Sequence, residues 1–314
     1  MATHPFVPVQ PPRTPDYIAA WRGFVGERMR NVIFGLPEPA FNAHYNRRES
    51  LGMTFHGISD PVAVERVMLT NKANYQRPRL ARRILAPLVG NGLLSAEGED
   101  WRVQRRIVAP TFAPAAVARM AETMDAAAAA DIAHWPTRAG RYDVTQATTR
   151  TTMAIIADSL FAGDARLTNP AAGRHIEQLV TAAGQTRLSS IFGFESWDFT
   201  ATMRRARVSR TWMRETLTQL VRERGPDGGT GALRDDFFGG LIRALHAQFP
   251  AEEAASLAVD NAITFYVAGH ETTANALAWT LYCLAGLPAL QEEARAEAVA
   301  AMDHAPAERF DHHP

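Results

Sequence analysis

Residues 251–287 contain no proline, and near their centre stands the string Ala268-Gly269-His270-Glu271-Thr272-Thr273. Apolar residues dominate both flanks of this string, so the whole stretch predicts one unusually long helix. At 1.5 Å per residue such a helix is roughly 55 Å long, which is enough to cross a domain of this size. We therefore expect a mainly α fold that is organised around this helix.

The string places a carboxylate and hydroxyl groups in an apolar helix, where an uncompensated polar group costs several kcal/mol if buried. Gly269 and Ala268 precede Thr272 by three and four positions, so we expect all three on one face. Small residues allow a flat ligand to approach the backbone, and a threonine hydroxyl can bond to the carbonyl four residues earlier, loosening the helix and admitting water. Glu271 is rotated by about 100° from Thr272 and would act through water or by swinging. This pattern suits proton delivery to a bound oxygen species, and a polar patch paired with neighbouring helices is the alternative.

Two other chemistries fail on the sequence. His270 and Glu271 begin the His-Glu-x-x-His pattern of zinc proteases, but position 274 is alanine. The glycine-rich run at residues 225–231 has no Gly-Lys-Ser/Thr ending and no preceding strand, so it predicts a surface turn and not a phosphate loop. We therefore assign no metal ligand in this sequence.

A second polar string, Trp101-Arg102-Val103-Gln104-Arg105-Arg106, precedes Pro110-Thr111-Phe112. Trp101 and Arg105 are four residues apart, so on a helix they project from one face. The indole N–H and the guanidinium only donate hydrogen bonds, which suits a carboxylate ligand. A cation–π contact between the two side chains is the alternative, and it gains weight because Lys72 is the only lysine and arginine serves everywhere else.

Composition restricts the class of partner. Lys and Arg together number 33, as do Asp and Glu, so the zero net charge favours neither nucleic acid nor an anionic membrane. The single cysteine, Cys283, excludes an intramolecular disulfide and suits a reducing compartment, which we take to be the cytoplasm. Residues 1–15 hold five prolines and predict neither a signal peptide nor a membrane anchor. We expect a soluble protein that binds a small neutral molecule.

The remaining pattern predicts helices and one strand pair. Leu51 to Ile58 is the candidate for a strand pair, and Asp60-Pro61 predicts the N-cap and first residue of a short helix that continues to Leu69. Periodic apolar residues predict further helices over residues 15–34, 114–135, 145–161, 171–188, 198–224, 232–248 and 288–302.

Taken together, the two polar strings resemble the cytochrome P450 family. Other parts of the sequence fit as well, namely Asn74-Tyr75-Gln76-Arg77 and then residues 92–98, which lead into Trp101. The similarity spans residues 21–302. The resemblance implies a P450 fold over residues 16–314, after a proline-rich segment at residues 1–15. It also implies a soluble, bacterial-type enzyme with a small and incomplete β-sheet.

The resemblance also implies roles for individual residues. Ala268 and Gly269 would lie over one face of haem b (iron protoporphyrin IX), Thr272 would assist protonation and scission of dioxygen, and Glu271 would belong to the proton relay. Trp101 and Arg105 would hold a haem propionate. Arg102 and Arg106 point away from that pair and predict a solvated face, with a docking surface for a ferredoxin or flavodoxin as the alternative.

One departure from the family restricts the function. Family members carry a Glu-x-x-Arg helix and then a cysteine loop that ligates iron, and we expect this chain to be truncated before both. Glu292 and Arg295 have the spacing but directly follow the long helix, so they predict an ordinary exposed pair. Cys283 lies about 16 Å beyond Thr272 along the same helix and predicts an ordinary buried cysteine.

These considerations leave three functions. The first is a monooxygenase that inserts one oxygen atom of O2 into an apolar substrate, with electrons from NAD(P)H through a separate redox partner. If this function is correct, we expect the adjacent downstream sequence to supply the missing Glu-x-x-Arg helix and cysteine loop. The second is a catalytically inactive helical remnant that binds haem or an apolar ligand. The third is an unrelated helical interaction domain. Because a strongly red-shifted Soret band of the reduced, carbon-monoxide-bound protein requires the thiolate, we expect this chain not to show it.

Overall fold

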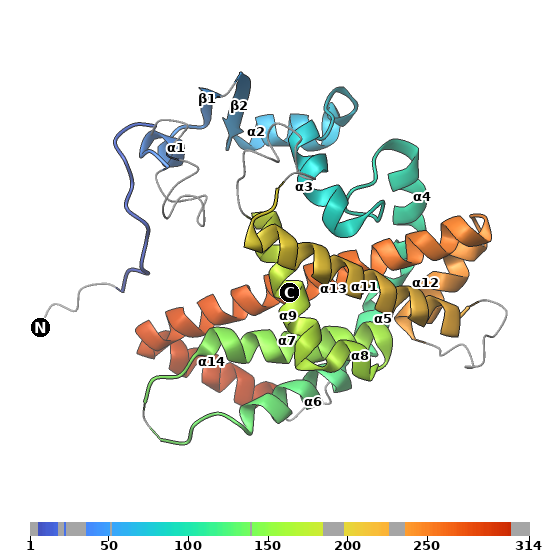
Figure 1. The fold of residues 1–314 in the computed structure, drawn as a ribbon. Helices are drawn as coiled ribbons and strands as arrows, with labels where there is room; N and C mark the ends of the chain where they lie inside the picture. The colour runs from blue at the N-terminus through green and yellow to red at the C-terminus, as the bar shows by residue number, and fades with distance from the viewer. Residues whose placement is uncertain are drawn as a thin grey trace, which may run out of the picture. The chain divides into compact units, whose positions relative to one another are not determined.

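The structure is a computed structural model that describes residues 6–17, 22, 36–50, 52–138, 140–184, 198–225 and 236–302. Within these residues the fold is mainly α, as expected, and Figure 1 shows the helices in chain order. The helices in the first part of the chain are α1 (Pro39–Asn42), α2 (Pro61–Glu65), α3 (Arg79–Val89), α4 (Gly98–Val108), α5 (Pro114–Ala118), α6 (Ala121–Ile132) and α7 (Val144–Phe161). The later ones are α8 (Ala165–Thr168), α9 (Pro170–Gly184), α11 (Ala201–Glu223), α12 (Phe237–His246), α13 (Ala251–Gly286) and α14 (Pro288–Ala301).

The chain forms two compact units. Unit 1 comprises Met1–Phe6, Leu88–Leu179 and Arg205–Pro314. Unit 2 comprises Val7–Pro87 and Val180–Arg204. Both polar strings of the sequence lie in unit 1, so their geometry can be compared directly.

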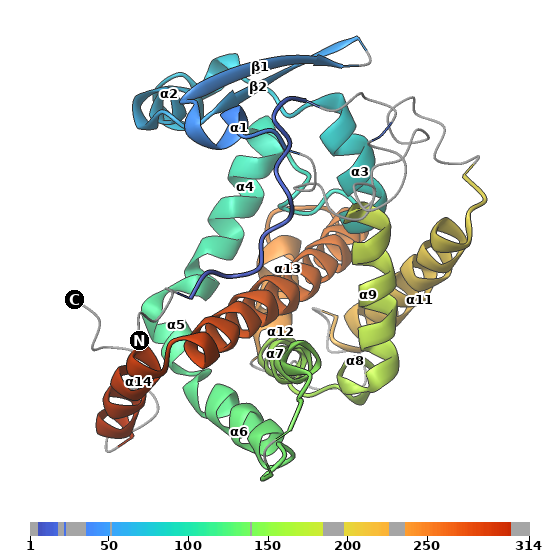
Figure 2. The same ribbon diagram turned by 90° about the vertical axis from the view of Figure 1, so that its left-hand side faces the viewer.

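Helix α13 is the centre of unit 1, and it confirms the long helix expected over residues 251–287. Pro250 precedes it, and Glu252 and Glu253 lie in its first turn, where carboxylates favour the positive end of the helix dipole. Its N-terminal half is buried, with Ile263 and Tyr266 among the fully enclosed side chains. Figures 1 and 2 show α13 crossing the unit with α7 and α12 beside it, and contacts join α13 to both helices.

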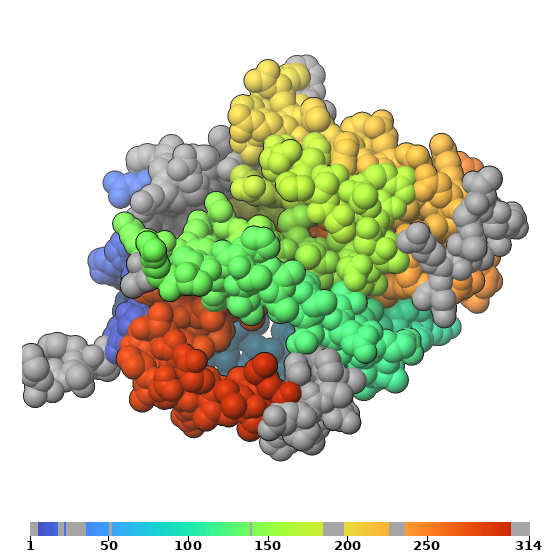
Figure 3. All heavy atoms as spheres, turned by 90° about the horizontal axis from the view of Figure 1, so that it is seen from below, coloured from blue at the N-terminus to red at the C-terminus, as the bar shows by residue number. Residues whose placement is uncertain are grey.

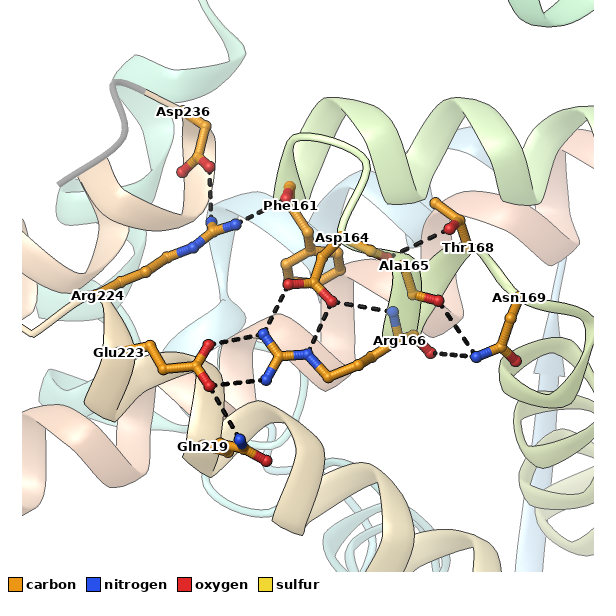
Figure 4. A network of polar contacts seen from close by, with 10 residues as sticks. All are labelled: Phe161, Asp164, Ala165, Arg166, Thr168, Asn169, Gln219, Glu223, Arg224 and Asp236. Carbon is orange, nitrogen blue, oxygen red and sulfur yellow. Dashed lines mark hydrogen bonds and ion pairs between the residues drawn. The ribbon is translucent and has the colours of Figure 1, made fainter. Parts of the chain in front are cut away.

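Arg224 joins the ends of three helices in unit 1. Its guanidinium donates to the Phe161 carbonyl at the end of α7 (2.8 Å) and to Asp236 Oδ2 at the start of α12 (2.6 Å). Asp236 also caps α12, because Oδ1 accepts from the Gly239 N–H. Figure 4 shows this arrangement, in which the side chains of Arg224 and Asp236 are only 7% and 10% exposed.

A second cluster beside it joins α8 to α11. Arg166 forms paired hydrogen bonds with Asp164, the N-cap of α8, and with Glu223, the last residue of α11 (Figure 4). The hydrogen bonds from Arg166 lower the pKa of both carboxyl groups, and the same bonds raise the pKa of Arg166. The cluster therefore favours the charged form of all three groups.

The cluster predicts a pH dependence of stability. Because the pKa of Asp164 and of Glu223 is lowered by folding, their stabilisation is complete above the ordinary values of 3.8 and 4.5 and is lost as the pH falls below about 4. We expect Arg166→Gln to lower the denaturant midpoint at pH 7 and to differ less from the parent at pH 3. Urea unfolding of both proteins between pH 3 and 7 measures this. A difference that is constant across this range would contradict the prediction.

Unit 2 contains the only sheet in the described part of the chain. β1 (Tyr45–Ser50) pairs antiparallel with β2 (Met53–Ile58), with Tyr45 opposite Ile58. The strand pair expected within residues 51–58 is confirmed for one strand only: β2 lies there, whereas its partner, β1, precedes residue 51 and was not predicted, because the polar sequence of β1 lacks an alternating apolar pattern. Asp60 caps α2 by accepting from the Ala63 N–H, as expected, and the chain continues in a π-helical turn, Arg66–Thr70.

Most predicted helices lie within a few residues of the observed ones. The helix expected over residues 114–135 is divided into α5 and α6, because the chain turns at Arg119 and Met120. Helix α3 was missed because it contains Pro87, which normally ends a helix. The helix expected over residues 15–34 and the turn expected over residues 225–231 lie almost wholly outside the described residues.

Within the described residues, no helix combines the length and apolarity that crossing a bilayer requires.

Candidate functional site

The exposed face of α13 carries Ala268 and Thr272. Thr272 Oγ1 donates to the Ala268 carbonyl at 2.7 Å, which is the back-bond expected from the sequence. The helix remains α-helical through this turn, so the expected loosening is not observed. Phe265 lies on the same face, because it precedes Ala268 by three residues and Thr272 by seven. The face therefore presents a small side chain and a hydroxyl whose proton is already directed to the backbone.

Gly269, which the sequence grouped with that face, is half-buried and borders α7. A Cβ on Gly269 would lie 2.5 Å from Ile156 Cδ1, on α7. The position is therefore glycine because two helices approach each other closely there. Thr152 of α7 strengthens the same contact by donating to the His270 carbonyl at 3.1 Å. Helix α7 thus holds the turn of α13 that precedes Thr272.

His270 and Glu271 occupy different surroundings. His270 is buried, and its Nδ1 lies 3.0 Å from the Tyr266 carbonyl, so it is a packing residue. Tyr266 itself is enclosed, with its hydroxyl donating to the Leu167 carbonyl, and burial raises its pKa. Glu271 is half-buried, and its carboxylate has no hydrogen bond or ion pair within the described residues. Of the two, only Glu271 remains available to a ligand or to water.

Helix α4 presents Trp101 and Arg105 to solvent, as the spacing predicted. Trp101 is 39% exposed, Arg105 is also exposed, and neither side chain makes a hydrogen bond, ion pair or cation–π contact within the described residues. The alternative of an arginine stacked on this indole is therefore not observed. Arg102, by contrast, pairs with Glu99 at 3.0 Å on an exposed face. The pair Trp101 and Arg105 consists of two open donors on one side of a helix.

Sequence reasoning missed the buried polar pair behind these faces. Gln104 of α4 and Asn261 of α13 are enclosed and bond to each other, Asn261 Nδ2 donating to Gln104 Oε1 at 2.9 Å. Phe265 forms edge-to-face contacts with Phe112 and Phe237, with ring centroids 5.8 and 5.5 Å away. For Gln104 and Asn261, the only signal in the sequence was a polar residue at an apolar position of each helix.

The C-terminal part of α13 is more open than its beginning. Leu277, Trp279 and Tyr282 are all at least 39% exposed. Seen from below in Figure 3, the surface is hollowed between the red helices α13 and α14 and the teal to green segment that holds α5 and α6. Cys283, expected to be buried, is only half-buried. Glu292 and Arg295 form an exposed pair at 3.4 Å, as predicted.

Comparison with known proteins identifies the class. A sequence profile described as Cytochrome P450 matches residues 48–311. The chain therefore belongs to the cytochrome P450 family, which confirms the resemblance. The crystal structure of a cytochrome P450 named CYP102L1 is similar in fold, with a TM-score of 0.64 and 23% identity over 84% of this chain and 60% of that one.

Two named relatives are each 30% identical to this chain. Cyclooctat-9-en-7-ol 5-monooxygenase of Streptomyces melanosporofaciens is 30% identical over 212 residues, which cover 67% of this chain and 45% of that protein. Cytochrome P450 714D1 of Oryza sativa subsp. japonica is 30% identical over 263 residues, which cover 76% of this chain and 44% of that protein. The chain thus spans about half the length of the curated relatives it matches.

Haem b is the cofactor of this family, and the site residues fit it in two respects. The open donors of Trp101 and Arg105 match the carboxylate of a haem propionate. Between Ala268 and Thr272, one turn after Phe265, the face of α13 carries only a methyl group and a hydroxyl-bearing side chain, which leaves room for a flat ring. Gly269 is half-buried at the edge of this face, whereas His270 is buried and faces the protein interior.

Proposed function

We propose that this chain forms the oxygen-side part of a haem-dependent monooxygenase that inserts one oxygen atom of O2 into a small apolar substrate. The observation that carries the proposal is the exposed Thr272 hydroxyl, held by the Ala268 carbonyl in the middle of α13. Residues 16–314 would form one P450 domain. We place the protein in the cytoplasm, with electrons supplied from NAD(P)H through a ferredoxin or a flavodoxin.

Residues of α4 and α13 would have different roles at the proposed haem site. Haem, when bound, supplies the redox chemistry that activates oxygen. Trp101 and Arg105 would hold a propionate and so orient the ring. Thr272 would donate its proton, or that of a water it binds, into the space in front of α13. Glu271, one residue before, would exchange that proton with solvent.

Titration of the 314-residue chain with haemin tests the cofactor site. We expect Arg105→Ala to raise the dissociation constant of haem about tenfold, because a hydrogen bond to a charged group contributes roughly 1.5 kcal/mol or more. Trp101→Phe, which removes only the N–H, should raise it less. Soret absorbance during the titration measures both effects.

Arg102→Ala is the matched control, because Arg102 lies on the same helix and is exposed but pairs with Glu99. Its haem affinity should equal that of the parent. Equal affinities for the Arg102 and Arg105 variants would overturn the assignment of α4 to the propionate.

A second function is favoured by the position of the only cysteine. Cys283 lies on α13 itself, eleven residues after Thr272, so it is not placed to ligate iron from the opposite side of a ring that faces Thr272. The 314-residue chain by itself would then bind haem or an apolar ligand without activating oxygen. A normal Soret position for its reduced, carbon-monoxide-bound form supports this second function for the isolated chain, and a strongly red-shifted band contradicts it.

A further inference from the structure

A buried network of carboxamide and carboxylate groups lies behind the exposed face of α4. Its two carboxamides, Gln104 and Asn261, are 3% and 0% exposed. They come from α4 and α13, the two helices that carry the proposed haem contacts. A buried amide must be fully hydrogen-bonded to avoid a desolvation penalty, so its partners fix its position closely.

Asn261 connects α13 to two other segments. Its Nδ2 donates to Gln104 Oε1 at 2.9 Å and to the Leu257 carbonyl of its own helix at 2.9 Å. Its Oδ1 accepts from the Leu93 N–H at 2.8 Å. Both ends of the carboxamide are therefore used, which allows one orientation only.

Gln104 completes the ring of contacts from the side of α4. Its Nε2 donates to the Asn91 carbonyl at 3.0 Å, and the Asn91 N–H donates to Asp260 Oδ2 at 2.7 Å. Asp260 in turn accepts from Arg214 of α11. The segment before α4 is thus hydrogen-bonded to two successive residues of α13, Asp260 and Asn261.

The glycines of this segment allow the close approach. Gly90 has φ of +59°, and a Cβ there would lie 2.2 Å from the Asp260 carboxylate. A Cβ on Gly92 would lie 2.8 Å from the Asp260 carbonyl oxygen. The backbone therefore rests directly on α13, leaving little freedom to the start of α4.

Gln104 is adjacent to Arg105 and three residues after Trp101. On a helix of 3.6 residues per turn, Gln104 lies about 100° around the axis from Arg105. Fixing the Gln104 side chain against Asn261 therefore fixes the rotation of α4, and with it the direction in which Arg105 projects. Val108, one turn later, is buried on the same side but has no polar atom in its side chain.

We propose that Gln104 and Asn261 are positioning residues that set the rotation of α4, so that Trp101 and Arg105 point to the haem propionate. This inference rests on the proposed function, because it concerns the same cofactor site. It assigns neither residue a contact with haem. Their effect on haem passes through the direction of the two donors.

A double-mutant cycle on haem affinity tests the proposal in the 314-residue chain. Gln104→Met removes the amide at similar length and should raise the haem dissociation constant about fivefold. Arg105→Ala should raise it about tenfold in the parent but less than threefold in the Gln104→Met background. In that background the guanidinium no longer points to the propionate, so removing it takes away little binding energy. Haemin titrations followed by Soret absorbance, with thermal unfolding of each haem-free variant, give all four values.

Val108→Ala is the matched control, since it weakens the same side of α4 without touching the amides. Its effect on haem affinity should be independent of Arg105→Ala. If Gln104→Met alone fails to fold, the cycle uses Gln104→Met with Asn261→Leu, which leaves neither amide facing a lost partner; the Leu93 N–H and the Asn91 carbonyl each lose one.

The outcomes separate the two proposals. Dependence of the Arg105 effect on Gln104 but not on Val108 supports the positioning role. If Arg105→Ala weakens haem binding equally in every background, the positioning role is wrong while the cofactor site stands. If Arg105→Ala has no effect even in the parent, the proposed cofactor site is wrong, and the positioning role falls with it.

Discussion

Replacing Arg224 by methionine is expected to lower the free energy of unfolding by about 3–5 kcal/mol, the typical effect of leaving one member of a buried ion pair without its partner. Arg224 and Asp236 are nearly enclosed, and the guanidinium also satisfies the Phe161 carbonyl at the end of α7. The variant therefore leaves a buried carboxylate and a buried carbonyl with one partner fewer. Urea unfolding monitored by circular dichroism at pH 7 measures the loss.

The chain offers two controls for this prediction. Arg222→Met removes an exposed arginine two residues away on α11 and should change stability by less than about 0.5 kcal/mol. Adding Asp236→Asn to Arg224→Met removes the unpaired charge but keeps an oxygen that can accept from the Gly239 N–H. This double variant should recover part of the loss. Equal losses for the Arg222 and Arg224 variants would show that the Arg224–Asp236 ion pair does not add to the free energy of unfolding.

Much of the fold could be predicted because local sequence patterns determine where its helices begin and end. The absence of proline between residues 251 and 287 predicted α13 to within one residue, and Asp60-Pro61 predicted the start of α2. The strand β1 and helix α3 could not be predicted in this way. β1 exists because β2 pairs with it, and α3 tolerates Pro87, so in both cases tertiary structure overrides a local preference.

The candidate site was predicted only in part, for a similar reason. Spacing of four residues correctly placed Trp101 with Arg105 and Ala268 with Thr272. Spacing could not show that Gly269 lies against α7, because that depends on where α7 packs. Ile156 occupies the space beside Gly269, and no feature of the string itself indicates this contact.

Replacing Thr272 by alanine is expected to lower the amount of product formed per NAD(P)H consumed roughly 100-fold, which is the lower end of what a positioned proton donor contributes. The hydroxyl is exposed and held only by the Ala268 carbonyl, so it can turn toward a ligand without breaking any contact with another helix. Haem affinity should not change, because the methyl group of alanine fits the same face. Under the monooxygenase proposal, the measurement is the amount of product formed against the amount of NAD(P)H oxidised by the haem-loaded protein with its redox partner.

Three variants separate a proton-delivery role from a merely structural one. Thr272→Ser keeps the hydroxyl and should restore most of the product yield. Thr280→Ala removes an equivalent back-bond, to the Ala276 carbonyl at 2.8 Å, two turns further along the same exposed helix, and should leave the yield unchanged. Thr273→Ala tests the adjacent hydroxyl, which is rotated about 100° away. An unchanged yield for Thr272→Ala with haem fully bound would remove Thr272 from the mechanism, because the back-bond alone would then account for the hydroxyl.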